Sequence, residues 1–334
     1  MNPQNTNPAA ETLLAILETG TSVTTSVLAQ RLHLPGEAVL ALTQSLTRQG
    51  YRLQMDQEGY IRLLPHADSL LPGYIRMGLP TKRIGQGSIF YEPEMGSTNT
   101  VLKQRATENA LPEGSLAVCD RQVAGKGRLQ RAWEMPDAGV ALPVSVLLTP
   151  SLPPAHLPLV TLAVAVAAAA AIEAVGQSPG VKWPNDVVLN GRKCVGILCE
   201  MGNGASGNPF IVAGAGFNVN QSAFAGELAQ KATSLAMEAG HPVDRLALLQ
   251  AYLVHLERAM ELLTQSGPEG LMPEYEARSV TLRRRVQVIG ATEVFEGLAT
   301  RVDETGALYV LDDQGTLRRV LSGDVSVRGV MGYV

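Results

Sequence analysis

The 334-residue sequence contains three cysteines, Cys119, Cys194 and Cys199. Their number is odd, no two of them form a C-x-x-C pair, and no histidine cluster lies near them. Disulfide frameworks and zinc sites both require more closely patterned cysteines and histidines. The sequence therefore predicts neither, and we expect the three side chains to be reduced thiols in the core.

The sequence also shows no visible export signal and no clear membrane-spanning run. Residues 1–9 are polar and rich in Asn and Pro, without the basic and apolar regions of a secretory signal peptide. The most apolar run, residues 157–172, is shorter than the roughly 20 residues that a spanning helix needs, and much of it is weakly apolar alanine. We therefore expect a buried helix there, in a cytoplasmic protein with no membrane partner.

An excess of positive charge is missing as well. The formal net charge is -4 at pH 7, so the whole chain has no basic character that would attract nucleic acid. Residues 1–64 contain four arginines, five acidic residues and no lysine. Any DNA binding must therefore depend on a local surface, and non-specific DNA affinity is expected to be weak.

The first part of the chain shows helical patterns followed by a hairpin pattern. Two short helical patterns, the first closed by Gly20, precede a third that runs from Gly36 to Arg48. Two alternating runs, residues 51–55 and 60–64, then flank the turn sequence DQEG. Three helices leading into a β-hairpin indicate a winged helix-turn-helix domain, which we assign to residues 1–70.

The remaining sequence divides into a linker and two further parts. Residues 71–83 hold two glycines and two prolines, which predicts a linker and a domain boundary near residue 75. From residue 84 to 276, strand-like runs alternate with helical patterns, as in an antiparallel or mixed α+β domain. From residue 278 to 334, short alternating strands are punctuated by turns, which is typical of a small β-barrel. The expected fold class is α+β with a separate all-β module.

A stretch with the sequence AGKGRLQRAW, residues 124–133, combines two glycines with three cations. It is not a Walker loop, because Lys126 is followed by Gly127 rather than by serine or threonine. The dinucleotide-binding fingerprint also fails, since it requires glycine where Gln130 stands. The residues leave two explanations open, an amide-rich loop that wraps an anion and a solvated basic hairpin.

Three further motifs carry candidate functional residues, and each also has a purely structural explanation. KWPND places Lys182 at the end of a strand before a turn at Pro184, and Lys193 stands at the start of the next strand. The structural explanation is that the same turn residues form a simple hairpin. STN, residues 97–99, could cap a helix. GAGFNVN, residues 214–220, allows close backbone approach and equally suits a tightly packed strand.

In this order and at these distances, the four motifs resemble those of the biotin protein ligases, which activate biotin with ATP and attach it to a lysine of a carrier domain. The family carries S-T-N, a glycine-arginine loop with G-R-x-W, K-W-P-N-D with a neighbouring G-R-K-x-x-G-I-L, and G-x-G-x-N-x-N. The matching segments here are residues 97–99, 125–133, 182–186, 191–198 and 214–220. The resemblance implies a class II synthetase-like catalytic domain at residues 84–276 and an SH3-like barrel at residues 278–334. The winged helix at residues 1–70 resembles the repressor arm of bifunctional members.

The resemblance also implies a role for each matched residue. The residues expected to bind biotin are Ser97, Thr98, Asn99, Gln122, Lys126, Gly127, Arg128 and Lys193. The residues expected to bind ATP or the adenylate are Arg131, Trp133, Asn185, Asp186, Gly196 and Asn218. The residues expected to be catalytic are Lys193, Arg128 and Lys182. ATP, biotin and Mg²⁺ are the implied ligands, with no metal held by a dedicated set of side chains.

Adenylation chemistry accounts for these residue types. A carboxylate that attacks an α-phosphate brings two anions together, so preorganised cations and amides lower the barrier. The product is a mixed anhydride that water destroys, which explains a glycine-rich loop that closes over it. Two residues depart from the family pattern. Lys126 stands where arginine is usual, which replaces a planar bidentate donor with a point charge, and Gln130 stands where glycine is usual.

The implied partners are the biotin carboxyl carrier protein of acetyl-CoA carboxylase or a similar carboxylase, a second copy of the chain and, as an option, operator DNA. Two other functions stay open. The first is a lipoate or octanoate protein ligase, against which the KWPND and GRK motifs argue. The second is a biotin-sensing DNA-binding regulator without ligase activity, against which the complete set of adenylating positions argues.

Overall fold

The computed structural model describes residues 7–135, 137–205, 207–290, 293–321 and 326–329. The chain forms two compact units, Met1–Pro80 and Thr81–Val334. The second unit contains both the segment predicted as the catalytic domain and the segment predicted as a separate β module, so the division into three domains stays a prediction. In the part of the chain that the structure describes, no helix is long and apolar enough to cross a membrane.

The first unit contains the three helices and the hairpin that the sequence predicts. The helices are α1 (Pro8–Leu17), α2 (Thr25–Leu32) and α3 (Gly36–Arg48), and the hairpin strands are β2 (Leu53–Met55) and β3 (Tyr60–Leu63). A strand missed by the sequence analysis, β1 (Val23–Thr24), pairs with β3 on the side away from β2. Leu13, Leu28, Leu46 and Ile61 are fully buried or nearly so, because each helix and the hairpin turn their apolar side chains to one core.

The stretch predicted as a linker is partly helical. Pro72 begins the short helix α4 (Pro72–Arg76), as proline suits the first turn of a helix. Tyr74 is buried, its hydroxyl accepts a hydrogen bond from the backbone N–H of Arg52 at 2.6 Å, and its ring lies 5.4 Å from that of Tyr51. Helix α4 thus lies inside the predicted linker, and the first unit ends at Pro80, within residues 71–83.

The second unit is built on a seven-stranded sheet in the order β4-β5-β8-β12-β11-β10-β9. The strands are β4 (Ile89–Met95), β5 (Leu116–Gln122), β8 (Ala141–Leu148), β9 (Gly180–Lys182), β10 (Asp186–Leu189), β11 (Arg192–Asn203) and β12 (Pro209–Asn218). Strands β4 and β5 pair in parallel, and the other neighbours in this order are antiparallel. This mixed sheet with its helices confirms the predicted α+β class.

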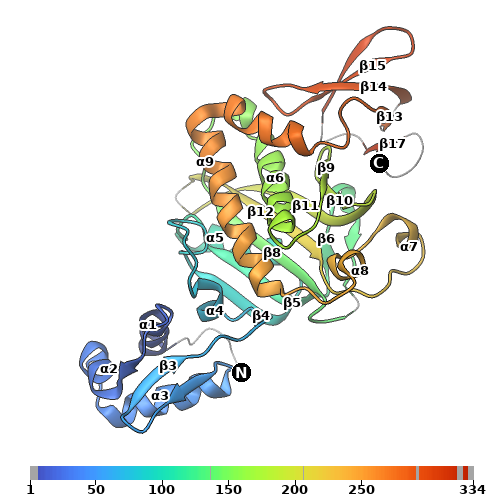
Figure 1. Ribbon diagram of the computed structural model, residues 1–334. Coiled ribbons are helices and arrows are strands. Elements are labelled where there is room, and N and C mark those ends of the chain that lie inside the picture. The colour runs from blue at the N-terminus through green and yellow to red at the C-terminus, as the bar shows by residue number, and fades with distance from the viewer. Residues whose placement is uncertain (1–6, 136, 206, 291–292, 322–325, 330–334) are drawn as a thin grey trace. The chain divides into compact units, whose positions relative to one another are not determined.

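The alternation of side chains along β12 distinguishes the two faces of this sheet. Phe217 points to one face, where its ring packs on Tyr252 of α9 (Arg245–Arg278) with the centroids 5.3 Å apart. Helix α6 (Leu159–Ala174), the predicted buried helix, packs beside α9 over the same face (Figure 1). Gly214 and Gly216 point to the opposite face, which is covered in part by α5 (Thr98–Glu108). The candidate functional residues gather on this α5 face.

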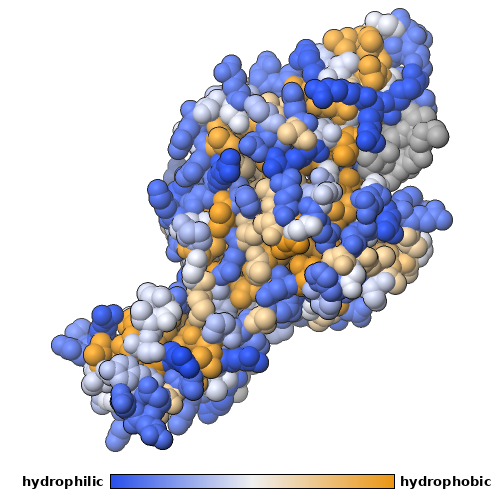
Figure 2. Space-filling view, in the orientation of Figure 1, coloured by the Kyte–Doolittle hydropathy of each residue, from blue (hydrophilic) through white to orange (hydrophobic). Residues whose placement is uncertain are grey.

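The C-terminal segment forms a five-stranded antiparallel sheet in the order β16-β15-β14-β13-β17. The strands are β13 (Arg285–Ile289), β14 (Val294–Val302), β15 (Leu308–Asp312), β16 (Leu317–Val320) and β17 (Ser326–Gly329). Trp183 joins it to the larger sheet, because its indole N–H donates to the carbonyl of Gly306 at 3.1 Å. Apolar side chains gather over β14 and β15 (Figure 2), where the cross-strand partners Leu298 and Leu311 are exposed.

The three cysteines are free thiols, as the sequence predicts. Cys119 and Cys194 are buried and Cys199 is partly buried. Burial raises the pKa of the Cys119 thiol to about 12 and that of Cys199 to about 11. The thiolate form, which is the reactive one, is therefore disfavoured at both positions.

Candidate active site

Two rows of cross-strand neighbours run side by side over the α5 face of the large sheet. The first row crosses β9, β10, β11 and β12 and consists of Lys182, Asp186, Gly196 and Gly216. The second row crosses β11, β12 and β8 and consists of Leu198, Gly214 and Ser145. Cross-strand partners point to the same face of a sheet, so the rows form two adjacent strips of one surface. We call them the charged row and the neutral row.

The neutral row supports a buried network of uncharged polar side chains. The side-chain oxygen of Gln122 accepts hydrogen bonds from the backbone N–H and the hydroxyl of Thr98, at 2.7 and 3.0 Å. The Ser145 hydroxyl lies 2.8 Å from the Thr98 hydroxyl and 2.6 Å from Oδ1 of Asn99. All four side chains are buried. Their mutual hydrogen bonds fix the orientation of each donor and acceptor before any ligand arrives.

Ser145 was not among the predicted site residues, although a single polar residue in an apolar strand is a recognisable signal. It is the one hydroxyl in the otherwise apolar run of β8, all of which is buried. A buried hydroxyl needs a partner, and Ser145 finds two on α5. Ser97 holds the N-cap position of α5 but makes no side-chain capping hydrogen bond within the described structure, so the capping explanation for this motif fails.

Close packing at Gly214 lets the neutral network form. A Cβ atom at this position would collide with Oδ1 of Asn99. The Asn99 amide donates to the carbonyl of Leu198 at 3.1 Å and to the carboxylate of Glu200 at 2.9 Å. The two explanations of the GAGFNVN motif therefore coincide at Gly214, because tight packing of the strand is what admits a candidate binding residue.

A β-bulge turns Lys193 towards the charged row. Val187 pairs with Val195, whereas Val188 pairs with Lys193, which leaves Cys194 as an extra residue on β11. Regular alternation would put Lys193 on the same face as Val195, and the extra residue reverses this. Sequence patterns assume regular alternation, so the bulge could not be foreseen.

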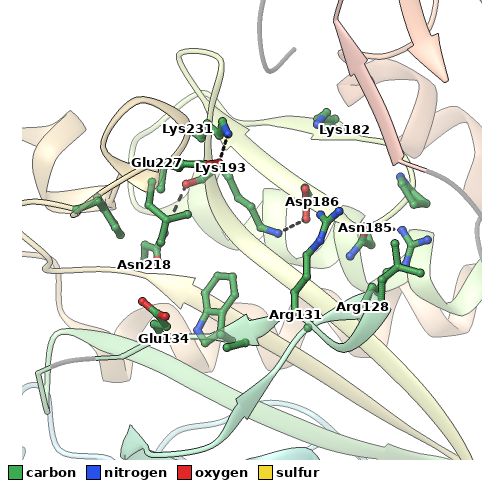
Figure 3. Close-up of a pocket in the computed structure, with 18 of the residues that line it drawn as sticks. Arg128, Arg131, Glu134, Lys182, Asn185, Asp186, Lys193, Asn218, Glu227 and Lys231 are labelled. Carbon is green, nitrogen blue, oxygen red and sulfur yellow. Dashed lines mark hydrogen bonds and ion pairs between the residues drawn. The ribbon is translucent and has the colours of Figure 1, made fainter. Parts of the chain in front are cut away.

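The Lys193 ammonium pairs with one carboxylate and lies near one ring. Its Nζ is 2.6 Å from Oδ1 of Asp186 (Figure 3). It also lies 5.5 Å from the centre of the Trp133 ring, close enough for a cation–π interaction. The ring itself packs on Gly196 and Gly216, where Cβ atoms would collide with it. These two glycines therefore form the floor beneath Trp133.

The indole N–H of Trp133 is a buried donor without a hydrogen-bond partner among the described residues. Native proteins satisfy most buried donors, so an unpaired donor at a candidate site calls for an acceptor. Asn218 lies at the end of the same glycine strand, where its amide donates to the carbonyls of Thr233 at 3.0 Å and Lys193 at 3.4 Å. The Asn218 side chain is thus held by the backbone around Lys193.

The glycine-cation loop is a short hairpin whose arginines face the site. Strands β6 (Gly125–Lys126) and β7 (Ala132–Trp133) pair antiparallel around the short 3-10 turn η1 (Arg128–Gln130). Nη1 of Arg128 donates to the side-chain oxygen of Asn185 at 2.9 Å. Burial lowers the pKa of Arg128, the Asp186 carboxylate opposes this shift and Arg131 adds to it. The hairpin explanation was therefore right about the shape, but Arg128 is not a solvated surface cation.

A cavity of about 480 Å³ opens between this hairpin and the charged row (Figure 3). The sequence-predicted residues that line it are Gly127, Arg128, Arg131, Trp133, Lys182, Asn185, Asp186, Lys193 and Asn218. The predicted residues outside its wall are Ser97, Thr98, Asn99, Gln122, Lys126 and Gly196. Gly196 lies under Trp133 and Lys126 is exposed, whereas the other four belong to the neutral network or adjoin it. The structure thus divides the predicted set into two groups.

The far wall of the cavity was not foreseen. It is formed by α7 (Leu228–Lys231) and the residues around it, namely Phe224, Glu227, Leu228, Lys231 and Ala232. Lys231 and Glu227 form an ion pair of 2.7 Å one helical turn apart. Such a pair is common on any exposed helix, so it gave no functional signal. Within the described ranges, no group of three or more His, Cys, Asp or Glu side chains could hold a metal ion.

Comparison with known proteins places these features in a family. Residues 93–218 match the Biotin/lipoate A/B protein ligase family, and residues 281–328 match the Biotin protein ligase C terminal domain. The chain is 34% identical to the Bifunctional ligase/repressor BirA of Bacillus spizizenii over 295 residues, which cover 87% of this chain and 89% of that protein. It is 33% identical to the Biotin--[acetyl-CoA-carboxylase] ligase of Mycobacterium tuberculosis, covering 77% of this chain and 97% of the relative.

The fold agrees with a solved structure as well. The Biotin protein ligase from Aquifex aeolicus in complex with biotin and ATP superposes with a TM-score of 0.64 at 28% identity, and the match covers 72% of this chain and 99% of that one. The similarity in sequence extends over most of the chain, and the residues matched by the first family model, 93–218, include strands that carry both rows. The chain therefore belongs to the biotin protein ligase family.

Proposed function

We propose that the protein is an ATP-dependent biotin protein ligase, which forms biotinyl-5'-AMP and transfers biotin to a lysine of a biotin carboxyl carrier protein. The observation that carries this proposal is the adjacency of the two rows. A buried, uncharged polar network lies beside a cation-lined cavity on one face of one sheet. Biotin has the same division, because an uncharged bicyclic ring system ends in a carboxylate.

The neutral network is suited to the biotin ring. Burying an uncharged polar ring costs free energy unless its N–H and C=O groups find partners. Thr98, Asn99, Gln122 and Ser145 present hydroxyl and amide groups in fixed orientations, with Ser97 adjacent in the chain. We assign these five residues to biotin-ring binding.

The charged row and the hairpin are suited to the reaction. A biotin carboxylate oxygen forms a bond to the α-phosphorus of ATP, and the bond from that phosphorus to the bridging oxygen breaks, which releases pyrophosphate. Lys193, Arg128 and Lys182 supply positive charge around this point, and Lys193 can exchange its contact with Asp186 for the reacting oxygens. Mg²⁺ bound to the ATP phosphates adds further positive charge.

The remaining cavity residues are assigned to the nucleotide. The Trp133 ring offers a flat surface for the adenine and its unpaired N–H offers a donor. Arg131, Asn185, Asp186 and Asn218 line the same cavity. We also assign Gly127 and Lys126 to the hairpin that covers the adenylate, and Gly196 to the floor. In the second half-reaction, the amine of the carrier lysine attacks the anhydride carbonyl and AMP leaves.

Transcriptional repression is a second proposed function, favoured by one observation. The match to the Bifunctional ligase/repressor BirA covers 87% of this chain, which is more than the second unit alone, so it extends into the first unit with its three helices and hairpin. We propose operator DNA as a partner of this unit. A second copy of the chain is a further proposed partner, and we propose the cytoplasm as the compartment because the reaction consumes ATP.

The test is an assay with ATP, labelled biotin and an apo carrier domain. We expect label on the carrier only when ATP is present, and formation of biotinyl-5'-AMP when the carrier is left out. Parallel reactions with labelled lipoate and octanoate should leave the carrier unlabelled. Transfer of lipoate or octanoate in preference to biotin, or binding of biotin without adenylate formation, would overturn the proposal.

A further inference from the structure

A single carboxylate outside the cavity wall collects three side-chain donors. Glu238 lies on α8 (Leu235–Ala239), and its side chain is 11% exposed. Its Oε1 accepts hydrogen bonds from Nη2 of Arg192 at 2.6 Å and from the Thr233 hydroxyl at 2.5 Å. Its Oε2 accepts one from the side-chain amide of Asn190 at 2.5 Å. Neither the sequence motifs nor the cavity includes Glu238.

The three donors lie close to Lys193, two of them in the chain and one through a backbone hydrogen bond. Asn190 lies in the turn between β10 and β11, and Arg192 directly precedes Lys193 on β11. Thr233 lies alongside, and its backbone N–H donates to the carbonyl of Lys193 at 2.9 Å. Glu238 therefore binds two segments. One is the turn and strand start that directly precede Lys193, and the other is the Thr233 segment, which is hydrogen-bonded to Lys193 itself.

The negative charge of Glu238 strengthens its three hydrogen bonds. Burial acts to raise the pKa of Glu238, but the hydrogen bonds from Thr233 and Asn190 and the positive charge of Arg192 outweigh it, so the pKa lies below its usual value. The side chain is ionised at neutral pH. Hydrogen bonds to an ionised acceptor are shorter and stronger than those between neutral groups.

The bulge at Cys194 explains why these hydrogen bonds from Glu238 matter for Lys193. Lys193 points into the site only because β11 holds one extra residue relative to β10. A bulge interrupts the regular ladder of hydrogen bonds, so the local strand is held less firmly by its own sheet. Contacts from outside the sheet must then fix the direction of the lysine side chain.

We infer that Glu238 is a positioning residue for Lys193, holding the bulged start of β11 and the Thr233 segment so that the lysine ammonium points at the reacting oxygens. The consequence for reaction rate rests on the proposed function, whereas the consequence for the Lys193 ammonium itself does not. The three side chains that donate to Glu238 do not line the cavity. Its effect is therefore expected on turnover rather than on substrate binding.

The first test measures the kinetics of adenylate formation in Glu238→Gln. Small misplacements of a catalytic group cost up to about 100-fold in rate, so we expect kcat to fall by about 10-fold or more with KM for ATP and biotin little changed. Glu173→Gln is the matched control. It breaks a two-bond carboxylate–arginine pair with Arg278, at 2.9 and 2.9 Å, between α6 and α9 and outside the cavity wall. We expect this control to retain wild-type kcat.

A double-substitution cycle shows whether Glu238 acts through Lys193. If it does, adding Glu238→Gln to Lys193→Ala causes little further loss, because the group being positioned is already gone. A purely structural role would instead make the two losses multiply, and that result would overturn the inference. Should Glu238→Gln fail to fold, Thr233→Val removes one of the three donors at similar volume and is expected to lower kcat in the same direction by a smaller factor.

A second measurement is independent of ligase activity. Acetylation of Lys193 by an amine-reactive ester, followed by mass spectrometry and compared with the exposed Lys82 in the same molecule, reports how well the ammonium is held against Asp186. We expect severalfold faster acetylation of Lys193 in Glu238→Gln and no change in Glu173→Gln. An unchanged rate would overturn the inference. If the wild type makes no adenylate, the proposed function fails while this measurement still decides the role of Glu238.

Discussion

The neutral row and the charged row lie on the same face of the same sheet, yet they are built in opposite ways. Over the neutral row, the side chains of Thr98, Asn99, Gln122 and Ser145 are already hydrogen-bonded to one another. In the charged row, the Lys193 ammonium pairs with Asp186, and the neighbouring Trp133 keeps a buried donor without a described partner. The difference indicates a fixed receptor for an unreactive ring beside groups that exchange partners during the reaction.

The largest expected effect comes from removing Lys193, whose ammonium pairs with Asp186 of the charged row. Lys193→Ala leaves the developing charge at the α-phosphate uncompensated, so we expect adenylate formation to fall by about 100-fold or more. Biotin-dependent pyrophosphate release measures it. Lys82→Ala, at an exposed lysine outside the cavity, is the control and should behave as wild type. A wild-type rate in Lys193→Ala would remove this residue from the reaction centre.

In the network over the neutral row, Asn99→Ala should act on stability and biotin binding together. It removes one of the two partners of the Ser145 hydroxyl and the amide that donates to the Leu198 carbonyl, which costs about 1–3 kcal/mol of unfolding free energy. Biotin affinity should fall while ATP affinity stays the same. Urea unfolding and calorimetry measure the two effects, with Asn109→Ala as the control, since the Asn109 side chain is exposed and donates to the carbonyl of Arg105 in its own helix. An equal loss of ATP affinity would contradict the separation of the rows.

The hairpin is expected to retain the intermediate. Arg128→Ala breaks the bond to Asn185, so the adenylate should escape severalfold faster and label lysines of bystander proteins. Labelling of serum albumin mixed into the reaction measures this escape. Arg121→Ala is the control, because Arg121 pairs with Glu94 outside the cavity. If Arg128→Ala labels the carrier alone, the covering role is wrong.

The smallest expected effect is on the pH dependence of stability, to which two carboxylates, Glu18 and Glu238, contribute with opposite signs. Burial raises the pKa of Glu18 in the first unit to about 7, although Arg76 opposes the shift. The folded state thus binds this proton more tightly than the unfolded state, and between about pH 4.5 and 7 its contribution to stability falls as pH rises. Glu238, with a lowered pKa, acts in the opposite sense, since its stabilisation is present above about pH 4.5 and is lost as pH falls further.

Chemical denaturation of Glu18→Gln at pH 5 and pH 8 tests the sign of this effect. Glutamine carries no charge at either pH, so the variant should gain stability relative to the wild type on going from pH 5 to pH 8. A relative loss at pH 8 would show that ionised Glu18 is stabilised by its surroundings instead.

Regular local patterns could be predicted from the sequence, and departures from them could not. The helix Gly36–Arg48 begins and ends where its periodicity predicts, and KWPND places Lys182 and Asp186 at facing strand ends. The bulge at Cys194 depends on how β11 pairs with β10, which no local pattern records. Glu238 was missed for a related reason, because its three partners come from two segments that only the fold brings together.

The separation of the two rows can be tested most directly by comparing biotin with its alcohol analogue, which keeps the ring and lacks the carboxylate. Calorimetry gives the ratio of their affinities for the wild type, Lys193→Ala and Asn99→Ala. We predict that biotin binds more tightly than the alcohol to the wild type, that Lys193→Ala lowers this ratio, and that Asn99→Ala weakens both ligands while preserving the wild-type ratio. An unchanged ratio in Lys193→Ala, or a ratio altered by Asn99→Ala, would contradict the division of the site into a neutral and a charged row.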